Sequence, residues 1–352
     1  MDKFNPQLLQ IARESRLLTQ KELANEINIT QGYLSKIESG VQLPDSILID
    51  NFSKTLKYPK EFFFVQTRKK DAHLDFYRKQ RTISTKQIDY LKAHINLYRI
   101  QLENLLSSIN FNVDKIPEYE VDITNGPEII AKSLRKFWNI ASGPIQNLSE
   151  LLEEHGFVII HTFIEDTIKF SGCSFFTRSH HPIIIINGTM PGDRIRFTIA
   201  HELGHLLMHK DDIYTQNRDI EKEANIFASE LLMPSREIKE QLIGIDLNKL
   251  IRIKHYWKTS IASLLEKAKS LNTITIDQYK YLRIKLNREG FAKKEPVEIP
   301  IEEIGLISEI LELYKSELGY SDKEISNLLY LYPEEYISKY KYHQRKRIRL
   351  IK

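Results

Sequence analysis

The stretch RIRFTIAHELGHLLMH, residues 194–209, places two histidines and a glutamate inside an otherwise strongly apolar helical pattern. His201 and His205 are four residues apart, so on a helix both imidazoles project from one face and can share one ion. Glu202 is rotated by about 100 degrees from His201, which suits contact with a water molecule rather than with the ion. The spacing is the HExxH arrangement of zinc metallopeptidases. The alternative is a pair of buried, hydrogen-bonded histidines.

A catalytic zinc site needs a third protein ligand, and the helix expected over residues 219–233 offers one. Glu223 falls within the inner face of this helix, whereas Glu221 points elsewhere. Glu230 lies two turns farther along that face and is a weaker ligand candidate or a residue that supports a ligand. Because Cys173 is the sole cysteine, no thiolate cluster forms, and we expect one zinc ion per chain. The apolar members of the inner face are Ile220, Ala224, Phe227 and Leu231.

Peptide hydrolysis at such a site follows a known chemical scheme. Zinc lowers the pKa of a water molecule, Glu202 takes the proton, and the resulting hydroxide attacks a polarised carbonyl. A further group is expected to stabilise the developing oxyanion. Tyr214, His209 and His255 are candidates, although such residues are more often structural.

The first 65 residues predict short helices separated by capping signals. Thr19-Gln-Lys-Glu22 is a capping box, and Thr30 can cap the next helix. That helix ends at Gly40, which can adopt the left-handed conformation common at helix ends. Two short helices joined by a tight turn form the helix-turn-helix plan. Leu43-Pro44-Asp45 then begins a fourth helix.

A longer amphipathic helix is predicted after the capping box Ser84-Thr-Lys-Gln87. Its apolar residues recur at alternating spacings of three and four, which is a heptad seam and could join two chains as a homodimer. Alternatively, the seam packs on the catalytic domain of its own chain, because Leu97, Ile100 and Leu106 widen the apolar face. The sequence leaves both interpretations open. The seam comprises Ile88, Leu91, Ile95, Tyr98, Leu102, Leu105 and Ile109.

Length and composition predict a globular protein of two or three domains, since the chain has 352 residues, of which 41% are hydrophobic and 28% charged. A single cysteine fits a reducing cytosol, and neither a signal peptide nor a membrane-spanning run is evident. We therefore expect a cytoplasmic protein with no membrane partner.

The net charge of +4 is unevenly distributed. Residues 66–99 contain nine Lys or Arg against three Asp, and residues 337–352 contain seven Lys or Arg and no acidic residue. Such clusters can meet nucleic-acid phosphates, or they can be a solvated linker and a solvated tail.

TQKELANEINITQGYLSKIESG, residues 19–40, followed by LPD and YPKEFFF, resembles the XRE (phage repressor/Cro-like) family over roughly the first 65 residues. The resemblance implies that the helix after Thr30 enters the major groove of double-stranded DNA. The alternative is a protein-binding domain, because residues 1–65 contain eight basic and eight acidic side chains and so have a weak electrostatic footprint. Carried over by position, Gln20 would touch phosphate, and the residues facing DNA would be Gln31, Gly32, Tyr33 and Lys36.

RIRFTIAHELGHLLMH, followed by EKEANIFASELLMP at residues 221–234, resembles the ImmA/IrrE family of metallopeptidases over about residues 127–240. This family often occurs fused to an XRE domain. The resemblance implies zinc bound by His201, His205 and Glu223, with Glu202 as general base. Farther on, LIRIKHYWKTSIASLLEKAKSLNTI, residues 250–274, resembles a winged-helix-like continuation of larger members.

The fold class we expect is α+β and mostly helical. It comprises a five-helix, lambda-repressor-like domain, a linker helix, a zincin-like domain with a small β-sheet, and a helical, winged-helix-like C-terminal region. The expected boundaries are 1–65 for the DNA-binding domain, 66–126 for the linker and amphipathic helix, 127–240 for the metallopeptidase domain, 241–295 for the winged-helix-like extension, and 296–352 for a helical module with a basic tail.

The functional hypothesis that follows is a transcriptional regulator that binds DNA and cleaves a partner protein. Family resemblance suggests that the protein substrate is another repressor or an antitoxin-like protein. One alternative is a transcription factor whose zinc domain senses a signal and cleaves nothing. Another is a component of a toxin–antitoxin system or a phage element.

Overall fold

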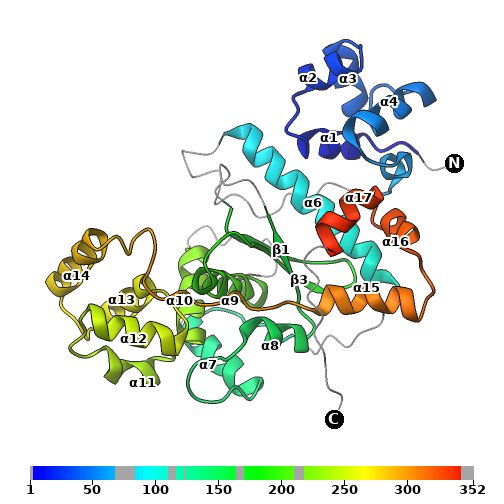
Figure 1. Ribbon diagram of the computed structural model, residues 1–352. Helices are drawn as coiled ribbons and strands as arrows, with labels where there is room; N and C mark the ends of the chain where they lie inside the picture. Colours follow the sequence, from blue (N-terminus) through cyan, green and yellow to red (C-terminus); the bar gives the residue numbers. More distant parts are fainter. Residues whose placement is uncertain are drawn as a thin grey trace.

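The computed structural model describes residues 3–67, 84–109, 116–122, 124–163, 170–209 and 218–341. Within them the chain is mostly helical around one small sheet, which confirms the expected α+β class. Figure 1 shows the N-terminal helices at one end, the sheet with α9 and α10 in the middle, and α11–α14 at the other end. Tyr214, the cations of the linker before Lys86, and the basic tail after Lys341 lie outside the described residues.

The N-terminal domain has the predicted helix-turn-helix arrangement. The capping box at Thr19 is formed, since Thr19 Oγ1 accepts from the Glu22 N–H at 3.2 Å and the Glu22 carboxylate accepts from the Thr19 N–H at 2.6 Å. The fifth helix is a short 3₁₀ turn that closes the core with Phe62 and Phe63. The elements are α1 (Pro6–Glu14), α2 (Gln20–Glu26), α3 (Gln31–Glu38), α4 (Ser46–Leu56) and η1 (Lys60–Phe64).

Helix α6 (Thr85–Ser107) lies between the N-terminal domain and the sheet and is buried on both sides (Figure 1). Ile95 and Leu102 pack in the core on the sheet, whereas Leu97 and Ile100 belong to the core of the N-terminal domain. The heptad seam is therefore core within a single chain. The homodimer interpretation of this seam is corrected accordingly, because five of its seven side chains are already buried within the chain, namely Leu91, Ile95, Tyr98, Leu102 and Leu105.

The sheet has three strands in the order β1-β3-β2, namely β1 (Val158–Thr162), β2 (Gly172–Phe176) and β3 (Pro182–Asn187). Strand β3 runs parallel to β1 and antiparallel to β2. Its aliphatic run is buried on both faces, since Ile184 and Ile186 join the core around α9 while Ile183 and Ile185 join the core around α6. A continuous apolar strand of this kind is expected where both faces of a sheet are covered.

The helices on the α9 face of the sheet build the metallopeptidase core. Helix α9 packs on β2 and β3, and α10 packs along α9 and against α7. Short helices continue the chain after α10. The bounds are α7 (Pro127–Phe137), α8 (Leu148–Glu154), α9 (Gly192–Met208), α10 (Ile220–Leu232), α11 (Ser235–Ile238) and η2 (Lys239–Leu242).

Residues 241–295 form helices α12 (Leu247–Trp257), α13 (Ile261–Ser270) and α14 (Ile276–Arg288), all of which are described. The expected helical character is confirmed, but this segment has no strand and hence no wing. Its attachment to α9 includes a buried ion pair between Lys254 and Asp193.

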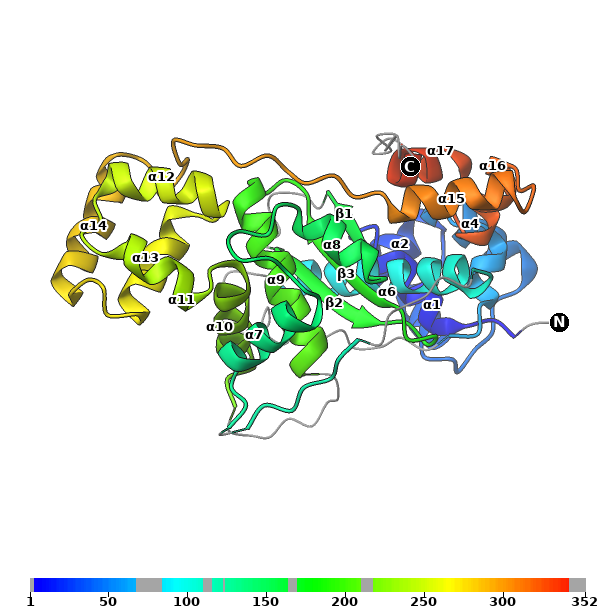
Figure 2. The same ribbon diagram turned by 90° about the horizontal axis from the view of Figure 1, so that it is seen from below.

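The chain then crosses back over the molecule to the N-terminal domain (Figure 2). Gly192, at the start of α9, lies so close to the crossing backbone at Ile299 and Pro300 that a Cβ atom there would collide with it. Glu302 accepts hydrogen bonds from the backbone N–H groups of Leu148 and Ser149 and pairs with buried Arg196. Glycine and this ion pair therefore fix the path of the crossing segment.

A C-terminal helical module completes the fold by bridging α6 and the N-terminal domain. Tyr314 Oη donates to the Leu105 carbonyl at 2.7 Å, and the Arg16 guanidinium pairs with Glu335 at 3.1 Å. No helix among the described residues is long and apolar enough to span a membrane. The module comprises α15 (Leu306–Ser316), α16 (Asp322–Leu328), α17 (Pro333–Tyr336) and the π-helical turn η3 (Ile337–Lys341).

Candidate metal centre

His201 and His205 face each other from consecutive turns of α9, as their spacing predicts. Their Nε2 atoms are 3.0 Å apart, and both imidazoles are partly buried. Four-residue spacing on a helix produces this arrangement without help from the rest of the chain. The pair therefore presents two ring nitrogens to one point in space.

Gly204 allows α10 to approach this point closely. A Cβ atom at Gly204 would lie 2.9 Å from Cδ1 of Phe227 and 3.4 Å from Cα of Ala224, both on α10. A larger residue would push the two helices apart. The glycine of the HELGH sequence thus brings the side chains of α10 within reach of the histidines.

The carboxylate that meets the histidines is Glu221. Its Oε2 lies 3.4 Å from His201 Nε2, and its Oε1 lies 3.4 Å from His205 Nε2. His201, His205 and Glu221 are the group in the described residues whose ligand atoms cluster closely enough to hold a metal ion.

The expectation of Glu223 as third ligand is therefore corrected in favour of Glu221. Of the apolar positions used to place the inner face, Ala224, Phe227 and Leu231 are buried and Ile220 is only half-buried. Ala228 and Leu232 are buried as well, so the buried apolar face of α10 is centred nearer to Glu221. Each residue turns the helix by about 100 degrees, so the two positions between Glu221 and Glu223 decide which carboxylate meets the histidines.

These three residues fit a zinc ion. Two neutral imidazoles and one carboxylate are a common catalytic zinc donor set, with bonds of about 2.0–2.2 Å. Tetrahedral bonds of that length place neighbouring donor atoms about 3.3 Å apart. The donor separations of 3.0 and 3.4 Å match that spacing.

Each histidine is oriented through its second ring nitrogen. His201 Nδ1 lies 3.1 Å from Asn225 Oδ1, and the amide oxygen can only accept. His201 therefore carries its proton on Nδ1 and leaves the Nε2 lone pair for a metal. Such outer hydrogen bonds fix the tautomer of a ligating histidine.

His205 is oriented by a chain of three further side chains. Its Nδ1 lies 3.0 Å from His209 Nδ1, and His209 Nε2 lies 2.9 Å from Glu223 Oε2. Burial lowers the pKa of His209 to about 4, so this ring is neutral at neutral pH. Neutral His209 donates through Nε2 to Glu223, so its Nδ1 accepts from Nδ1 of His205. In this tautomer of His205 the proton is on Nδ1, and the Nε2 lone pair faces the metal centre.

Glu223 and Arg218 anchor that chain. The Arg218 Nε donates to Glu223 Oε1 at 3.0 Å. Burial opposes the ionisation of Glu223, but the hydrogen bonds from Arg218 and His209 outweigh it and lower the pKa of the carboxyl. Glu223 thus reaches the two histidines only through His209, which contacts His205.

Glu202 lies next to the histidines and is nearly buried. Ser174 Oγ, on the neighbouring strand β2, donates to Glu202 Oε2 at 2.8 Å. This contact holds the carboxylate while leaving its other oxygen to accept a proton.

The remaining candidates are placed elsewhere. Glu230 is buried and bonds Lys267 Nζ at 2.7 Å and the Ser235 N–H at 3.1 Å, so it joins α10 to α13 and does not support a ligand. His255 is exposed on α12, and Tyr214 lies outside the described residues.

Sequence analysis did not assign a role at this site to Glu221, Asn225, Ser174 or Arg218. For two of them, Glu221 and Asn225, the sequence does contain a signal. Glu221 and Asn225 are separated by four positions, which puts a carboxylate and an amide on one helix face. Ser174 and Arg218 have no such signal. Ser174 comes from β2, and Arg218 from the segment just before α10, so their contacts are recognisable only once the chain has folded.

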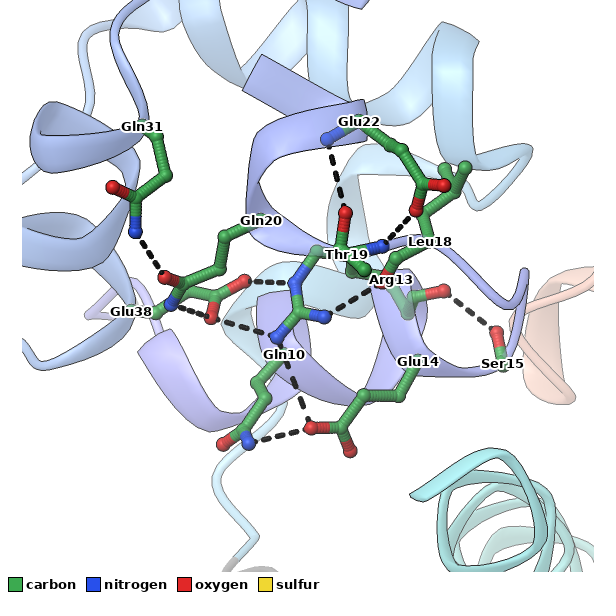
Figure 3. Close-up of polar contacts among 11 residues, drawn as sticks. Gln10, Arg13, Glu14, Ser15, Leu18, Thr19, Gln20, Glu22, Gln31 and Glu38 are labelled. Atoms are coloured by element: carbon green, nitrogen blue, oxygen red, sulfur yellow. Dashed lines mark hydrogen bonds and ion pairs between the residues drawn. The ribbon is translucent and has the colours of Figure 1, made fainter. Parts of the chain in front are cut away.

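The expected DNA-reading helix is accessible on the outer end of the N-terminal domain. Gln31, Gly32 and Lys36 are exposed and Tyr33 is half-buried. Figure 3 shows that Gln31 donates to Gln20, at 2.8 Å.

Gln20 in turn donates to Glu38 at 2.8 Å, and Arg13 pairs with the same Glu38 carboxylate (Figure 3). Two glutamines from adjacent helices are therefore held side by side by an ion pair beneath them. In this structure Gln20 has a positioning contact to Gln31, in addition to the phosphate contact that the resemblance implies.

Two family models match separate parts of the chain. Residues 9–63 match the helix-turn-helix family model, and residues 155–269 match the model of the IrrE N-terminal-like domain. The radiation response metalloprotease IrrE of Deinococcus radiodurans is 37% identical over an alignment of 73 residues, which covers 18% of this chain and 22% of the length of that relative. The chain carries a helix-turn-helix domain of the XRE type and an IrrE-like metallopeptidase domain.

Proposed function

We propose that this protein is a DNA-binding transcriptional regulator whose zinc-dependent endopeptidase domain cleaves a partner regulatory protein, of repressor or antitoxin-like type. The observation that carries the peptidase half is the convergence of His201, His205 and Glu221 beside Glu202. The domain boundaries expected at 126/127 and 240/241 remain a prediction within this proposal.

The proposed mechanism assigns separate tasks to these residues. His201, His205 and Glu221 would hold zinc, which supplies Lewis-acid polarisation of a peptide carbonyl and makes water more acidic. Glu202 takes a proton from water at the oxygen that Ser174 does not contact, and it later delivers that proton to the leaving amine. Asn225 and the His209–Glu223 pair keep both imidazoles in the ligating tautomer.

Glu202→Gln is expected to keep zinc and fold but to lose proteolysis, by about 10²–10⁴-fold, because an amide cannot accept the proton. The variant serves first as a trap to isolate a partner protein, whose cleavage by the wild type is then followed by electrophoresis and mass spectrometry. Glu289→Gln, at an exposed position after α14, is the matched control. Equal cleavage by Glu202→Gln and wild type would refute Glu202 as the base.

A non-cleaving sensor is a second candidate, and the shared burial of α6 favours it. One side of α6 is core to the N-terminal domain and the other is core to the sheet, so the DNA reader and the metal domain form one packed body. A change at the metal centre can reach the DNA-reading end through that body. If the wild type does not cleave the partners captured by Glu202→Gln, that result favours the sensor function over the peptidase function.

For the DNA-binding half, Gln31→Ala should weaken binding to a selected sequence by about 1–3 kcal/mol, the usual value of a good base contact. Gln20→Ala should produce a smaller loss, because Gln31 remains but is no longer held. The probes are a duplex selected by the wild type from a random pool and a duplex of random sequence. Asn287→Ala, exposed on α14, is the control. Equal losses on both duplexes would show that Gln31 reads no base.

A further inference from the structure

Helix α14 exposes three large apolar side chains at the end of the molecule opposite to the N-terminal domain (Figure 1). Ile276, Tyr281 and Ile284 are 63%, 62% and 68% exposed, and we call these three residues the α14 patch. Leu282 and Leu286 are buried in the core and hold α14 in place, so the fold does not require the patch to be apolar. Large apolar side chains gathered at one place on a surface mark an interaction site.

Basic side chains surround the α14 patch. Helix α14 carries four Lys or Arg and a single acid, Asp277, whose carboxylate faces Lys280 at 3.8 Å. Arg283 and Arg288 are exposed, and they lie about two helical turns after the first two residues of the patch, on the same sides of the helix. The surface therefore fits a partner that presents apolar residues and carboxylates together.

Buried ion pairs join this unit to both helices that carry the metal ligands. Lys254 of α12 pairs with Asp193 at the start of α9, and Lys267 of α13 pairs with Glu230 of α10 at 2.7 Å. All four side chains are buried, and α13 in turn packs on α14. Breaking a buried pair leaves an uncompensated charge in the core, so the α14 patch has a fixed position relative to the metal centre.

From these observations we infer that the α14 patch docks an acidic, amphipathic segment of the protein substrate while another part of that substrate enters the metal centre. The inference rests on the proposed peptidase function and extends it to the chemistry of the substrate. A helical segment with apolar residues three or four positions apart lays its apolar face on a surface of this kind. Carboxylates beside that face meet Arg283 and Arg288 and strengthen binding at low salt.

Nucleic acid fits the α14 patch less well than an acidic protein segment. A phosphate backbone would pair with the arginines but would leave the three apolar side chains without an apolar contact. The DNA-reading helix also lies at the opposite end of the molecule (Figure 1).

The first test measures binding alone, on full-length Glu202→Gln, so that nothing is cleaved. The probe is a short fluorescent peptide of leucine and glutamate, with leucines at alternating spacings of three and four. The comparison probes are the same peptide with lysine in place of glutamate and a DNA duplex of random sequence. Fluorescence polarisation reports binding, and thermal melting and zinc content report on folding.

Two variants of α14 are made in the same Glu202→Gln background. One combines Tyr281→Ser with Ile284→Ser, and the other combines Arg283→Gln with Arg288→Gln. The control combines Leu313→Ser with Leu318→Ser, which are 44% and 49% exposed in the C-terminal module.

We expect the acidic peptide to bind the parent protein about tenfold more tightly than the basic peptide, and added salt to weaken that binding. Each α14 variant should bind the acidic peptide about tenfold more weakly than the parent, because it lacks either the apolar or the cationic half of the surface. The control should bind it like the parent, and all variants should bind the DNA duplex equally.

The second test uses the α14 variants with Glu202 intact and the partner protein captured by Glu202→Gln. The KM for the whole partner should rise about tenfold with kcat unchanged, because docking is lost and the chemistry is not. A peptide that contains only the cleavage site does not reach α14, so its cleavage should not slow.

The inference is wrong if the α14 variants bind the acidic peptide as tightly as the parent, if the basic peptide binds equally well, or if the KM for the whole partner is unchanged. Loss of DNA affinity in these variants would instead make α14 a nucleic-acid surface. Parent copies that associate in light scattering, and separate in the variants, would assign the patch to a second copy of the chain. If the acidic peptide binds at α14 but the wild type cleaves no captured partner, the docking surface stands and the proposed peptidase function fails.

Discussion

Glu221→Ala is expected to lose zinc on dialysis, whereas Glu223→Ala should retain it with weakened affinity. Glu221 places one oxygen 3.4 Å from each ligating histidine nitrogen, so its loss removes one of three ligands. Glu223 reaches the centre only through His209 and His205. Changes in such outer partners typically lower metal affinity by about 10–100-fold. Metal analysis and titration against a competing chelator measure both values.

A control for this comparison is Glu289→Ala, a carboxylate lost from an exposed position far from α9. Circular dichroism on each variant separates loss of the ligand from loss of the fold. Full zinc occupancy in Glu221→Ala would place the third ligand elsewhere. If Glu223→Ala alone lost the metal, the ligand expected from the sequence would be the correct one.

The pair of histidines was predictable from the sequence because both residues belong to one helix. A spacing of four fixes their relation whatever surrounds them. The third ligand depends on how α10 rotates against α9, and that rotation is set by packing around Gly204 and Phe227. Glu221 and Glu223 both lie near the edge of the inner face, so an error of a fraction of a turn exchanges them.

For α6 the sequence predicted only two alternatives, an interface between chains or packing within one chain. A stripe with heptad spacing shows that a partner covers it but not which one. In the structure the sheet and the C-terminal module cover the side that carries Ile95 and Leu102, and the N-terminal domain covers Leu97. The module returns from more than 200 positions along the chain, as the bond from Tyr314 to the Leu105 carbonyl shows. No local sequence pattern in α6 indicates that the C-terminal module packs against it.

Because α6 is core to both neighbouring units, Ile95→Glu combined with Leu102→Glu should unfold or aggregate the whole protein. Both side chains are buried against the sheet side of the molecule. A buried unpaired charge costs several kcal/mol, and a typical domain is stable by only about 5–15 kcal/mol. Two such charges are enough to exceed that margin. Light scattering, zinc content and thermal melting on the purified variant are the measurements.

Thr85→Glu combined with Ser107→Glu adds the same two charges to exposed ends of the same helix and should leave the protein folded and zinc-loaded. The two pairs therefore differ in burial and not in net charge. If the Ile95 and Leu102 variant were a folded monomer with full zinc and weaker DNA binding, the seam would be an interface between chains after all. Leu97 and Ile100 of the same helix are part of the core of the N-terminal domain. Loss of the α6 packing should therefore abolish DNA binding and zinc binding together.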